Sequence, residues 1–566
     1  MKQKLETALQ QAVASLLEEH GVEAEVKVAL NRPRQKEHGD YACNVAMALA
    51  GRVSQKPHDV AEKLLERVDW PAGVEGAEIA GPGFINIQLH HASEMDVVRL
   101  IVDEAKAYGR AEPSGKSVNI EFVSANPTGP MHVGHGRGAV VGDALAHVLS
   151  ACGFDVFREY YINDAGAQIG VLAESVWLRL REINGESITL PEGFYPGEYV
   201  IDVAHQIMAH HEFSTLAEMD AAERASLLGA LAIDAMMDII RDDLASLGIS
   251  FDLFYSERQL HESGRVQELI EHLKDKGLVY EGVLPPPKGK EVTDYQPVEQ
   301  LLFRTTDFGD DVDRPLAKQD GTPTYFAADI AYHEDKNGRS FDRMVDVWGA
   351  DHGGYVTRVQ AAMQALTGKK KCPEVMLVQM VNLTREGKPV RMSKRAGTFV
   401  TLREVVDEVG RDAVRFNFLT RRAETQLDFD LEVAKQKNDE NPVYYVQYAH
   451  ARVCSIMRKL RNEGIEAADP DDVDVSLLSN DEEKNLVRKL LAYPEVLDKA
   501  ATRLEPYRVA VYLMELAANL HTYYHKHRVM VEDVALVQAR LLLMRAVRQV
   551  IDNGLGLLGV GAPEEM

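Results

Sequence analysis

The sequence predicts an α/β protein with a doubly wound parallel sheet at its centre. A strand–helix–strand pattern runs between Ser117 and Ile162, and such a unit places its two strands parallel in one sheet. A shorter mixture of strand and helix patterns precedes it, and from about residue 405 only helical spacing remains. We therefore expect a Rossmann-like domain with an insertion, flanked by a small N-terminal α/β domain and an all-α C-terminal domain.

The 566 residues are enough for about three or four domains. We place them at residues 1–112, 113–400 and 401–566, with the insertion at about residues 170–300. No apolar run is long enough to span a bilayer, and the N-terminus predicts an amphipathic helix with acidic residues, not a signal peptide. The four cysteines are scattered without zinc-ligand spacing, so we expect a cytosolic protein without bound zinc.

The N-terminal segment predicts a strand over Val26–Leu30 and another after the turn at residues 80–83. In that second strand Phe84, Asn86 and Gln88 alternate with isoleucines and so share one face. An exposed aromatic ring beside two amides would stack on an unpaired base and hydrogen-bond to it. A buried Phe84 that belongs to the core fits the same pattern equally well.

The central motif is a strand over residues 117–124, a loop over residues 125–130, and a helix that follows. His132 and His135 stand where this helix begins, together with Gly134. A helix start presents unpaired N–H groups and a partial positive charge, which suits phosphate. The pattern predicts nucleotide binding, although a glycine-rich helix start with two surface histidines is the simpler interpretation.

After the second strand, Asp155–Ile162, residues 170–300 interrupt the alternating pattern with helices and loops. Three histidines in this insertion, His205, His210 and His211, do not have the spacing of a standard metal site, so a helix surface is the better prediction.

The second half of the sheet begins with residues 321–332. Tyr325 and Asp329 are four residues apart and so share one face of a helix. A phenol and a carboxylate suit a guanidinium, which needs several acceptors, but the pattern alone fits a solvated aspartate as well. A strand over Phe341–Trp348 leads into Gly349 and Asp351, and Met376–Val381 predicts a further strand.

The net charge of −25 argues against simple nucleic-acid binding, because a polyanion is normally met by a basic surface. The distribution of charge is uneven, however. Residues 411–461 carry ten lysines and arginines against seven acidic residues, so the C-terminal third is the predicted RNA-binding face. There Tyr445 and Tyr448 are three residues apart and would stack on unpaired bases. An equal case exists for Tyr444 or Tyr445 as a core residue.

Two separated motifs, His132-Val-Gly-His135 and Arg391-Met-Ser-Lys394, resemble the two signatures of class I aminoacyl-tRNA synthetases. The blocks around them narrow the resemblance to the arginyl-tRNA synthetases. It covers nearly the whole chain in the right order: residues 121–135, 160–166, 320–329, 348–352 and 441–450, with the final residues 563–566. Each block is weak by itself, but together they are hard to obtain by chance.

The resemblance implies a set of site residues. For catalysis it implies His132, His135 and Lys394, and for ATP it implies Gly134, Gly349, Asp351, His352, Val381, Arg391, Met392 and Ser393. For arginine it implies Glu121, Ser124, Asn126, Tyr325 and Asp329. For tRNA it implies Phe84, Asn86 and Gln88 near the elbow, and Tyr445, Tyr448 and Met566 near the anticodon. The chain departs from many family members at Gly129, where they carry a lysine that replaces the loop lysine; here Lys394 is present instead.

The resemblance also implies a reaction. Arginine and ATP, with Mg²⁺, would form arginyl-adenylate, and the arginyl group would pass to tRNA(Arg), which is expected to be needed for activation. We expect a monomer that binds no membrane. The alternatives are an enzyme of the same fold that joins an adenylate to a small amine, a non-catalytic tRNA-binding relative, and another class I synthetase.

Overall fold

The computed structural model describes residues 2–24, 26–31, 33, 38–71, 73–89, 94–284, 298–390 and 400–566. The chain folds into two compact units, each built from three segments. The first comprises Met1–Lys106, Ile456–Ala492 and Asn519–Val550, and the second comprises Ala107–Ser455, Tyr493–Ala518 and Ile551–Met566. Among the described residues, no helix combines the length and apolarity that crossing a bilayer requires.

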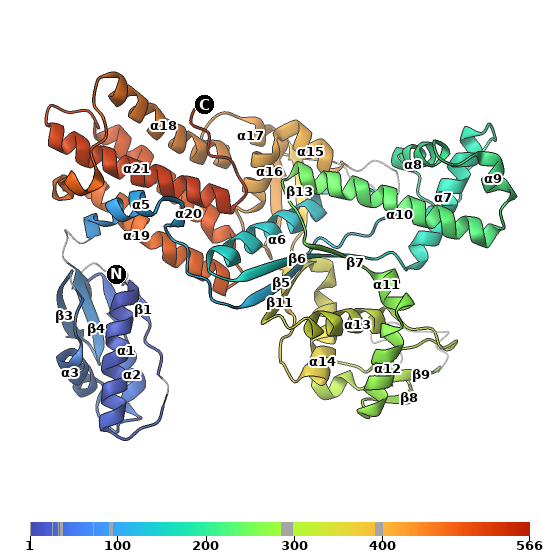
Figure 1. Ribbon diagram of the computed structural model, residues 1–566, viewed down its shortest axis with the longest axis horizontal. Helices are drawn as coiled ribbons and strands as arrows, with labels where there is room; N and C mark the ends of the chain where they lie inside the picture. The colour runs from blue at the N-terminus through green and yellow to red at the C-terminus, as the bar shows by residue number, and fades with distance from the viewer. Residues whose placement is uncertain are drawn as a thin grey trace. The chain divides into compact units, whose positions relative to one another are not determined.

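The N-terminal part of the first unit is a four-stranded antiparallel sheet with helices packed against it (Figure 1). The strand order is β1-β2-β4-β3. Its elements are α1 (Lys2–Glu19), β1 (Leu30–Asn31), β2 (Tyr41–Cys43), α2 (Val45–Ala50), α3 (Pro57–Arg67), β3 (Val74–Ala80) and β4 (Phe84–Leu89). The apolar stripe of α1, which includes Leu5, Leu9 and Val13, is fully buried against this sheet and its helices.

The strand that the sequence predicts over Val26–Leu30 is wrong for most of its length, since only Leu30 and the residue after it form a strand. The side chain of Gln10 explains the difference. Its amide donates to the Val26 carbonyl at 2.8 Å and accepts from the Val28 N–H at 2.9 Å. A side chain of α1 therefore takes the backbone hydrogen bonds that a neighbouring strand would otherwise make.

The remainder of the first unit consists of helical segments held together by arginines. In α5 (Val97–Glu104), the Arg99 Nε donates to the Pro470 carbonyl at 3.0 Å. Arg540 lies 2.9 Å from Glu483, and both side chains are almost fully buried. A buried pair of this kind fixes which helix faces meet, because separating the partners would leave a charge without a partner in the interior.

The second unit contains a five-stranded, fully parallel sheet in the order β12-β11-β5-β6-β7. The strands are β5 (Ser117–Phe122), β6 (Asp155–Ile162), β7 (Leu253–Ser256), β11 (Arg343–Gly349) and β12 (Glu374–Val378). The predicted doubly wound sheet is confirmed. The order reverses between β5 and β11, and ligands in such sheets bind beside that point, at the carboxyl ends of the strands.

Helices cover both faces of this sheet. In Figure 1, α6 (Val133–Ala151) lies on one face, and α13 (Tyr325–Gly338) and α14 (Val356–Thr367) lie on the other. Gly142 of α6 packs directly on Phe122 of β5, where a Cβ atom would overlap the aromatic ring. The glycine therefore sets the close approach of this helix to the sheet.

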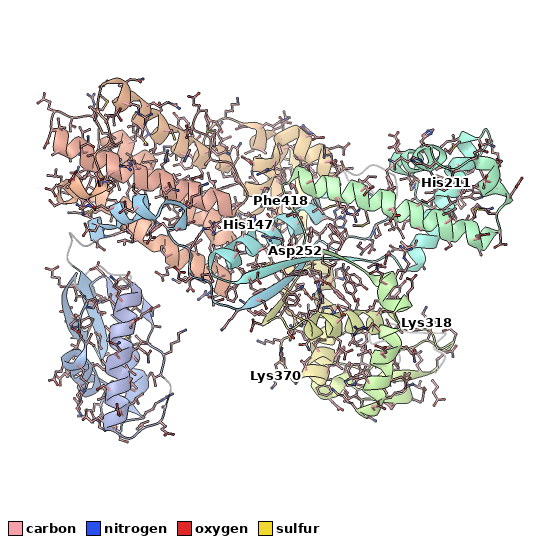
Figure 2. The ribbon with its side chains drawn as sticks, viewed as in Figure 1. His147, His211, Asp252, Lys318, Lys370 and Phe418 are labelled. Atoms are coloured by element: carbon pink, nitrogen blue, oxygen red, sulfur yellow. The ribbon has the colours of Figure 1, made fainter. Side chains whose placement is uncertain are left out.

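Residues 170–300 form an insertion only in part, because β7 lies within them and belongs to the sheet. This strand has four residues and pairs only with β6, so its sequence carries little periodicity. The helices α7 (Ala167–Ile183), α8 (Glu198–Met208), α9 (Phe213–Glu218) and α10 (Ala221–Ser246) share a separate hydrophobic core. Figure 2 shows His211 on this helical block, away from the sheet.

After β7 come α11 (Glu257–Glu262), α12 (Arg265–Asp275) and a small antiparallel sheet of β8 (Val279–Val283), β9 (Glu299–Phe303) and β10 (Arg314–Pro315).

The single strand that the sequence predicts over Met376–Val381 is divided between two strands in the structure. It breaks at Gln379 and Met380, between β12 and β13 (Val381–Arg385), which pairs with β14 (Lys388–Pro389) and β15 (Leu427–Asp430). Short 3₁₀ helices are η2 (Ala105–Ala107), η3 (Thr305–Phe308), η4 (Ala350–Tyr355), η6 (Pro470–Asp472) and η7 (Val475–Leu477).

The sequence predicts helices alone from about residue 405, and β15, which pairs with β13, departs from that prediction. The chain is helical after β15. The helices that lead up to and follow it are α15 (Leu402–Val409), α16 (Arg411–Phe418), α17 (Leu431–Lys435), α18 (Pro442–Asn462), α19 (Asp481–Thr502), α20 (Tyr507–Lys526) and α21 (Val534–Leu557). Arg415 of α16 is fully buried, pairs with Asp143 of α6, and donates to the carbonyls of Leu247 and Leu558 at 2.9 and 2.8 Å. This guanidinium joins three distant stretches of the second unit.

Candidate active site

The second unit holds a cavity of about 760 Å³ at the carboxyl ends of β5, β6 and β11, which we call the central cavity. Eleven residues that the sequence singles out line it: Glu121, Ser124, Asn126, His132, Gly134, His135, Tyr325, Asp329, Gly349, Asp351 and His352. Val381 does not line it, although the preceding Gln379 and Met380 do. Arg391, Met392, Ser393 and Lys394 lie outside the described residues.

The backbone is strained where β5 enters the central cavity. Val123 and Ser124 have positive φ angles of 72° and 41°, a region that non-glycine residues seldom adopt and that is unusual for a β-branched side chain. This turn directs the Ser124 hydroxyl to Glu121, to which it donates at 2.9 Å, while it accepts from the Tyr161 N–H at 3.1 Å. Strain of about 1–3 kcal/mol at such positions persists only where the surroundings fix it, and it is concentrated at binding sites.

The two histidines cap the start of α6, as the sequence predicts. The Nδ1 atom of His132 accepts from the backbone N–H groups of Gly134 and His135, at 3.1 and 3.4 Å. The Nδ1 atom of His135 accepts in turn from the His132 N–H at 3.4 Å, and the rings stack with centroids 3.6 Å apart. Because Nδ1 accepts in both rings, each neutral ring carries its proton on Nε2, which makes Nε2–H a donor.

The helical block of residues 167–246 holds the loop that precedes these histidines. The Tyr199 hydroxyl donates to the Thr128 carbonyl at 2.9 Å and lies about 3.0 Å from where a Cβ atom on Gly129 would stand. The buried Asp243 carboxylate accepts from the Met131 N–H at 3.3 Å. Burial raises the pKa of Asp243 to about 6, because it outweighs that hydrogen bond. The loop conformation thus depends on side chains more than 70 positions away in sequence.

The residues that follow the second signature, from Thr401 onward, lie beside the first signature, which contains His132 and His135. Thr401 forms an antiparallel bridge with His132, and the Leu402 N–H donates to the Met131 carbonyl at 2.8 Å. Thr401 also caps α15 in a capping box with Glu404. Residue 401 is seven positions from Lys394, so the structure brings the chain that follows the second signature to the first histidine.

On the opposite side of the central cavity, the first turns of α13 present Tyr325 and Asp329. Tyr325 is 58% exposed, and the Asp329 carboxylate accepts from the Tyr355 hydroxyl. Burial raises the pKa of Asp329 to about 6, against the lowering effect of Tyr355. Their shared helix face is confirmed, and it points the phenol and carboxylate into the cavity that also holds the histidines.

Sequence reasoning missed two residues of this acidic region. Glu257, the first residue of α11, is 3% exposed and lines the central cavity, and burial raises its pKa. Tyr161 lines it too, and its buried hydroxyl lies beside the Glu257 carboxylate. Glu257 directly follows β7, so recognising that strand would have placed this carboxylate at a strand end. Neither Asp329 nor Glu257 pairs with a lysine or arginine within the described part of the chain.

The residues after β11 lie at the open edge of the central cavity. The side chains of Asp351 and His352 are 76% and 63% exposed, so they present a carboxylate and an imidazole to a ligand that enters. A Cβ atom on Gly349 would meet an oxygen of the exposed Asp351 side chain at 2.4 Å, and that side chain is free to turn aside. Because Gly349 has no Cβ atom, its backbone allows close approach by a flat ring.

The predicted amide pair around Phe84 needs correction. Phe84 is 39% exposed and Gln88 is exposed, but Asn86 is only 3% exposed. Asn86 lies on the inner strand β4, where it is paired with Ala42 of β2 on one side and Glu78 of β3 on the other. The interpretation of Phe84 as a core residue is also wrong, since the opposite face of β4 supplies the core.

In α18, the aromatic stack differs from the predicted pair. Tyr444 and Tyr448 stack with parallel rings 5.8 Å apart, and the Arg452 guanidinium lies 4.6 Å from the Tyr448 ring centroid. Tyr445 is half-buried on the neighbouring side of the helix. The C-terminal tail lies against α18, where the His450 ring contacts the Pro563 carbonyl at 2.8 Å. Met566, the last residue, is 52% exposed.

Known proteins match the whole chain. Three family models match in succession: the arginyl tRNA synthetase N terminal domain over residues 3–89, the class I (R) tRNA synthetase catalytic domain over residues 96–430, and the DALR anticodon binding domain over residues 446–566. An arginine–tRNA ligase of Magnetococcus marinus is 50% identical over 577 residues, which cover 100% of both chains. One of Roseobacter denitrificans is 49% identical and covers 95% of this chain and 94% of its own. The solved arginyl-tRNA synthetase of Thermus thermophilus is 24% identical, covers 100% of each chain and has a TM-score of 0.74, which shows a common fold.

Proposed function

The chain belongs to the arginyl-tRNA synthetase family and is an arginine–tRNA ligase, and we propose that the central cavity is where it joins arginine to AMP. The observation that carries this proposal is the acidic side of the cavity. Asp329 and Glu257 are carboxylates with raised pKa values, and they have no lysine or arginine partner among the described residues. A guanidinium supplies the missing positive charge together with several N–H donors.

In the proposed pose the arginine side chain reaches Asp329, Glu257 and the Tyr325 hydroxyl. Ser124, Asn126 and Glu121 then hold the end of the substrate that carries the amino and carboxylate groups. The fixed turn at residues 123–124 supports this assignment, because it holds Ser124 in one orientation. The lining of the 760 Å³ cavity also includes His132, Gly134, His135 and the residues after β11, which leaves those residues for ATP.

Mg²⁺-bound ATP is proposed to lie between the start of α6 and the residues after β11. Gly134, Gly349, Asp351 and His352 would contact the adenosine, with the backbone near Val381. The Nε2–H donors of His132 and His135 would contact the phosphates. Lys394, with Arg391, Met392 and Ser393, is proposed to supply further positive charge, and the bridge between Thr401 and His132 supports its approach to the same phosphates.

The reaction needs no general acid or base in its first step. A carboxylate oxygen of arginine attacks the α-phosphorus, forming the acyl–phosphate bond, while the bond to the β-phosphate oxygen breaks and pyrophosphate leaves. Catalysis then consists of positioning the two substrates and stabilising negative charge on the transferred phosphate by the imidazole donors and Lys394. A ribose hydroxyl at the 3′ end of tRNA next attacks the arginyl carbonyl and forms an ester, the bond from that carbonyl to the phosphate oxygen breaks, and AMP leaves while the hydroxyl proton passes to the phosphate or to water.

We propose that tRNA(Arg) contacts two separate surfaces. One is the face of β4 that exposes Phe84 and Gln88; Asn86 lies between them in the strand, and its side chain is buried. The other is α18 with Tyr445, Tyr448 and the C-terminal Met566. The stacked pair of Tyr448 and Arg452 supports the second surface, because flat cationic and aromatic groups bind unpaired bases. We further propose a monomer in the cytosol, and activation that depends on bound tRNA.

The deciding experiment is a charging assay with each of the twenty amino acids. We expect arginine alone to be attached to tRNA(Arg), and Asp329→Asn to lower kcat/KM for arginine by about two orders of magnitude. Asp335→Asn, on the same helix but outside the central cavity, is the matched control and should leave that value nearly unchanged. Preferential charging of another amino acid, or equal losses in both variants, would contradict the proposal. Pyrophosphate exchange with and without tRNA tests the dependence on tRNA.

A further inference from the structure

Beneath the acidic side of the central cavity lies a group of buried charges that we call the buried ion cluster: Glu121, His333, Lys336 and Asp346. Lys336 of α13 is 0% exposed, and its ammonium lies 2.8 Å from a Glu121 oxygen and 2.7 Å from an Asp346 oxygen. One cation thus joins α13 to two neighbouring strands, β5 and β11. An unpaired ammonium at this depth would be strongly destabilised, so the three charges depend on each other.

His333 continues the cluster toward Asp329. Its Nε2 lies 2.8 Å from the second oxygen of Asp346, and its Nδ1 lies 2.7 Å from the backbone carbonyl of Asp329. Both contacts are with acceptors, so both nitrogens donate and the ring is an imidazolium. Burial alone would lower the pKa of His333, but the hydrogen bond and charge of Asp346 outweigh it and raise the pKa. Asp346, whose pKa falls to about 2 despite its burial, stays ionised between the two cations.

Three side chains of the cluster, Glu121, His333 and Asp346, are close enough together to hold a metal ion. The Lys336 ammonium already makes short contacts with both of these carboxylates, and the imidazolium has no lone pair to offer. A divalent ion would therefore meet two positive charges. The chain supplies its own cation here, which excludes a metal role for these residues.

The cluster connects directly to substrate-binding positions. One oxygen of Glu121 is bound by Lys336, and the other accepts from Ser124, so the carboxylate has a single orientation at the edge of the central cavity. The Asp329 turn is bound through its carbonyl by His333. Without the ammonium, Glu121 and Asp346 would face each other as buried like charges, and one of them would take a proton or turn away.

We propose that Lys336 is a positioning residue for arginine recognition: its buried ammonium holds the Glu121 carboxylate in one orientation, and through Asp346 and His333 it fixes the turn that carries Asp329. This inference rests on the proposed arginine site. In this proposal Lys336 contacts neither arginine nor ATP. The sequence gives no indication of it, because a lysine on a helix is normally exposed.

A second ion pair, directly after the end of the same helix, provides a matched control. Arg339, three residues beyond Lys336, donates to both oxygens of Glu159 at 2.8 Å, and Glu159 is fully buried on β6. Asn119 and Tyr332 complete the hydrogen bonds of that carboxylate. Like Lys336, Arg339 ties α13 to the sheet, but neither Arg339 nor Glu159 lines the central cavity.

The test compares the steady-state charging of tRNA by Lys336→Met, Lys336→Arg and Arg339→Met, with the Tm of each variant. We expect Lys336→Met to raise the KM for arginine about tenfold or more, since it removes a hydrogen bond between charged groups, while the KM for ATP changes less than about twofold. Lys336→Arg keeps the charge and should recover most of the arginine affinity. Arg339→Met should lower the Tm with little change in the KM for arginine.

A purely structural role predicts another result. If Lys336→Met raised the KM values for arginine and ATP in parallel, or left the KM for arginine unchanged, the inference would be overturned. Should Lys336→Met not fold, the double variant with Asp346→Asn removes the ammonium together with one carboxylate. It should regain stability and still have the raised KM for arginine, and a wild-type KM in that variant also overturns the inference. Wild-type charging with arginine tests the proposed function separately, because the inference depends only on ratios between variants.

Discussion

Arginine should bind more weakly as the pH falls through about 6, because Asp329 must be ionised to pair with the guanidinium. In the arginine-free protein, burial raises the pKa of this carboxyl to about 6, well above its ordinary value of 3.8. The guanidinium stays charged throughout this range, so the aspartate alone determines the sign of the effect. Binding favours the ionised form, and below pH 6 each arginine that binds must displace a proton.

The size of the effect follows from the fraction of Asp329 that is ionised. At pH 5 about nine-tenths of the carboxyl is protonated, whereas at pH 8 almost none is. If the bound complex keeps the carboxylate ionised, the Kd for arginine should be about tenfold higher at pH 5 than at pH 8. Burial raises the pKa of Glu257 as well, so its titration would steepen the same dependence and would not reverse it.

Isothermal titration calorimetry of arginine binding at pH 5 to 8 measures this directly. Repeating each titration in buffers with different ionisation enthalpies counts the protons released, and we expect about one at pH 5 and none at pH 8. Tyr355→Phe is the sharpest variant. It removes the hydroxyl that donates to Asp329, a hydrogen bond that lowers the pKa of the carboxyl, so the midpoint should move to higher pH. Tyr325→Phe keeps all carboxylates and their partners, and it should leave the midpoint in place.

A Kd for arginine that is constant between pH 5 and 8 would refute the reasoning, because the binding carboxylate would then have an ordinary pKa. A midpoint that Tyr355→Phe does not move would also refute it, since another group would be responsible for the titration. Equilibrium binding is preferred to kcat here, because kcat also depends on the groups that contact ATP.

Three further changes have defined outcomes. Arg415→Met leaves a carboxylate buried without its partner and should lower the free energy of unfolding by about 3–5 kcal/mol in urea titrations; a loss near zero would contradict the role of this guanidinium. Gly142→Ala should destabilise by about 1–3 kcal/mol because its Cβ overlaps Phe122, whereas Gly138→Ala on the same helix has open space and should not. Tyr448→Ala should raise the KM for tRNA about fivefold or more, through lost base stacking, without changing the KM values for arginine and ATP; a parallel rise in all three would indicate misfolding instead.

The sequence predicts those elements whose periodicity is long and local. The strand after Ser117, the helix after His132 and the strand ending at Ile162 follow from residue patterns within 50 positions, and all three are confirmed. Four-residue β7 was missed because so short a strand has no measurable period, and its place in the sheet depends entirely on pairing with β6. The failure at Val26–Leu30 has a similar cause, since a glutamine on another element replaces the missing strand partner.

The candidate site divides in the same way. Glu121, His132, Tyr325 and Asp329 belong to recognisable motifs, so the sequence identifies them as site residues even though their functional roles stay predictions. Glu257 has no motif around it, and it enters the central cavity only because β7 ends there. The exposure of Asn86 was also unpredictable, because alternation along a strand gives the face of a side chain but not whether neighbouring strands cover that face.

The charges around the central cavity explain why recognition and stability are assigned to different residues. Glu159 is neutralised by Arg339, and Glu121 and Asp346 share Lys336, so these carboxylates are balanced in the absence of substrate. Asp329 accepts from the Tyr355 hydroxyl, and Glu257 lies beside the Tyr161 hydroxyl and 3.4 Å from the His261 imidazole, but neither carboxylate pairs with a lysine or arginine among the described residues. The first set holds α13 against the sheet, and the second set remains available to a cation that comes from solution. An internal lysine near Asp329 would stabilise the empty protein and compete with the substrate guanidinium. Lys336 and Arg339 do not line the cavity, so the charges of these two side chains leave Asp329 and Glu257 to the substrate guanidinium, as an arginine site requires.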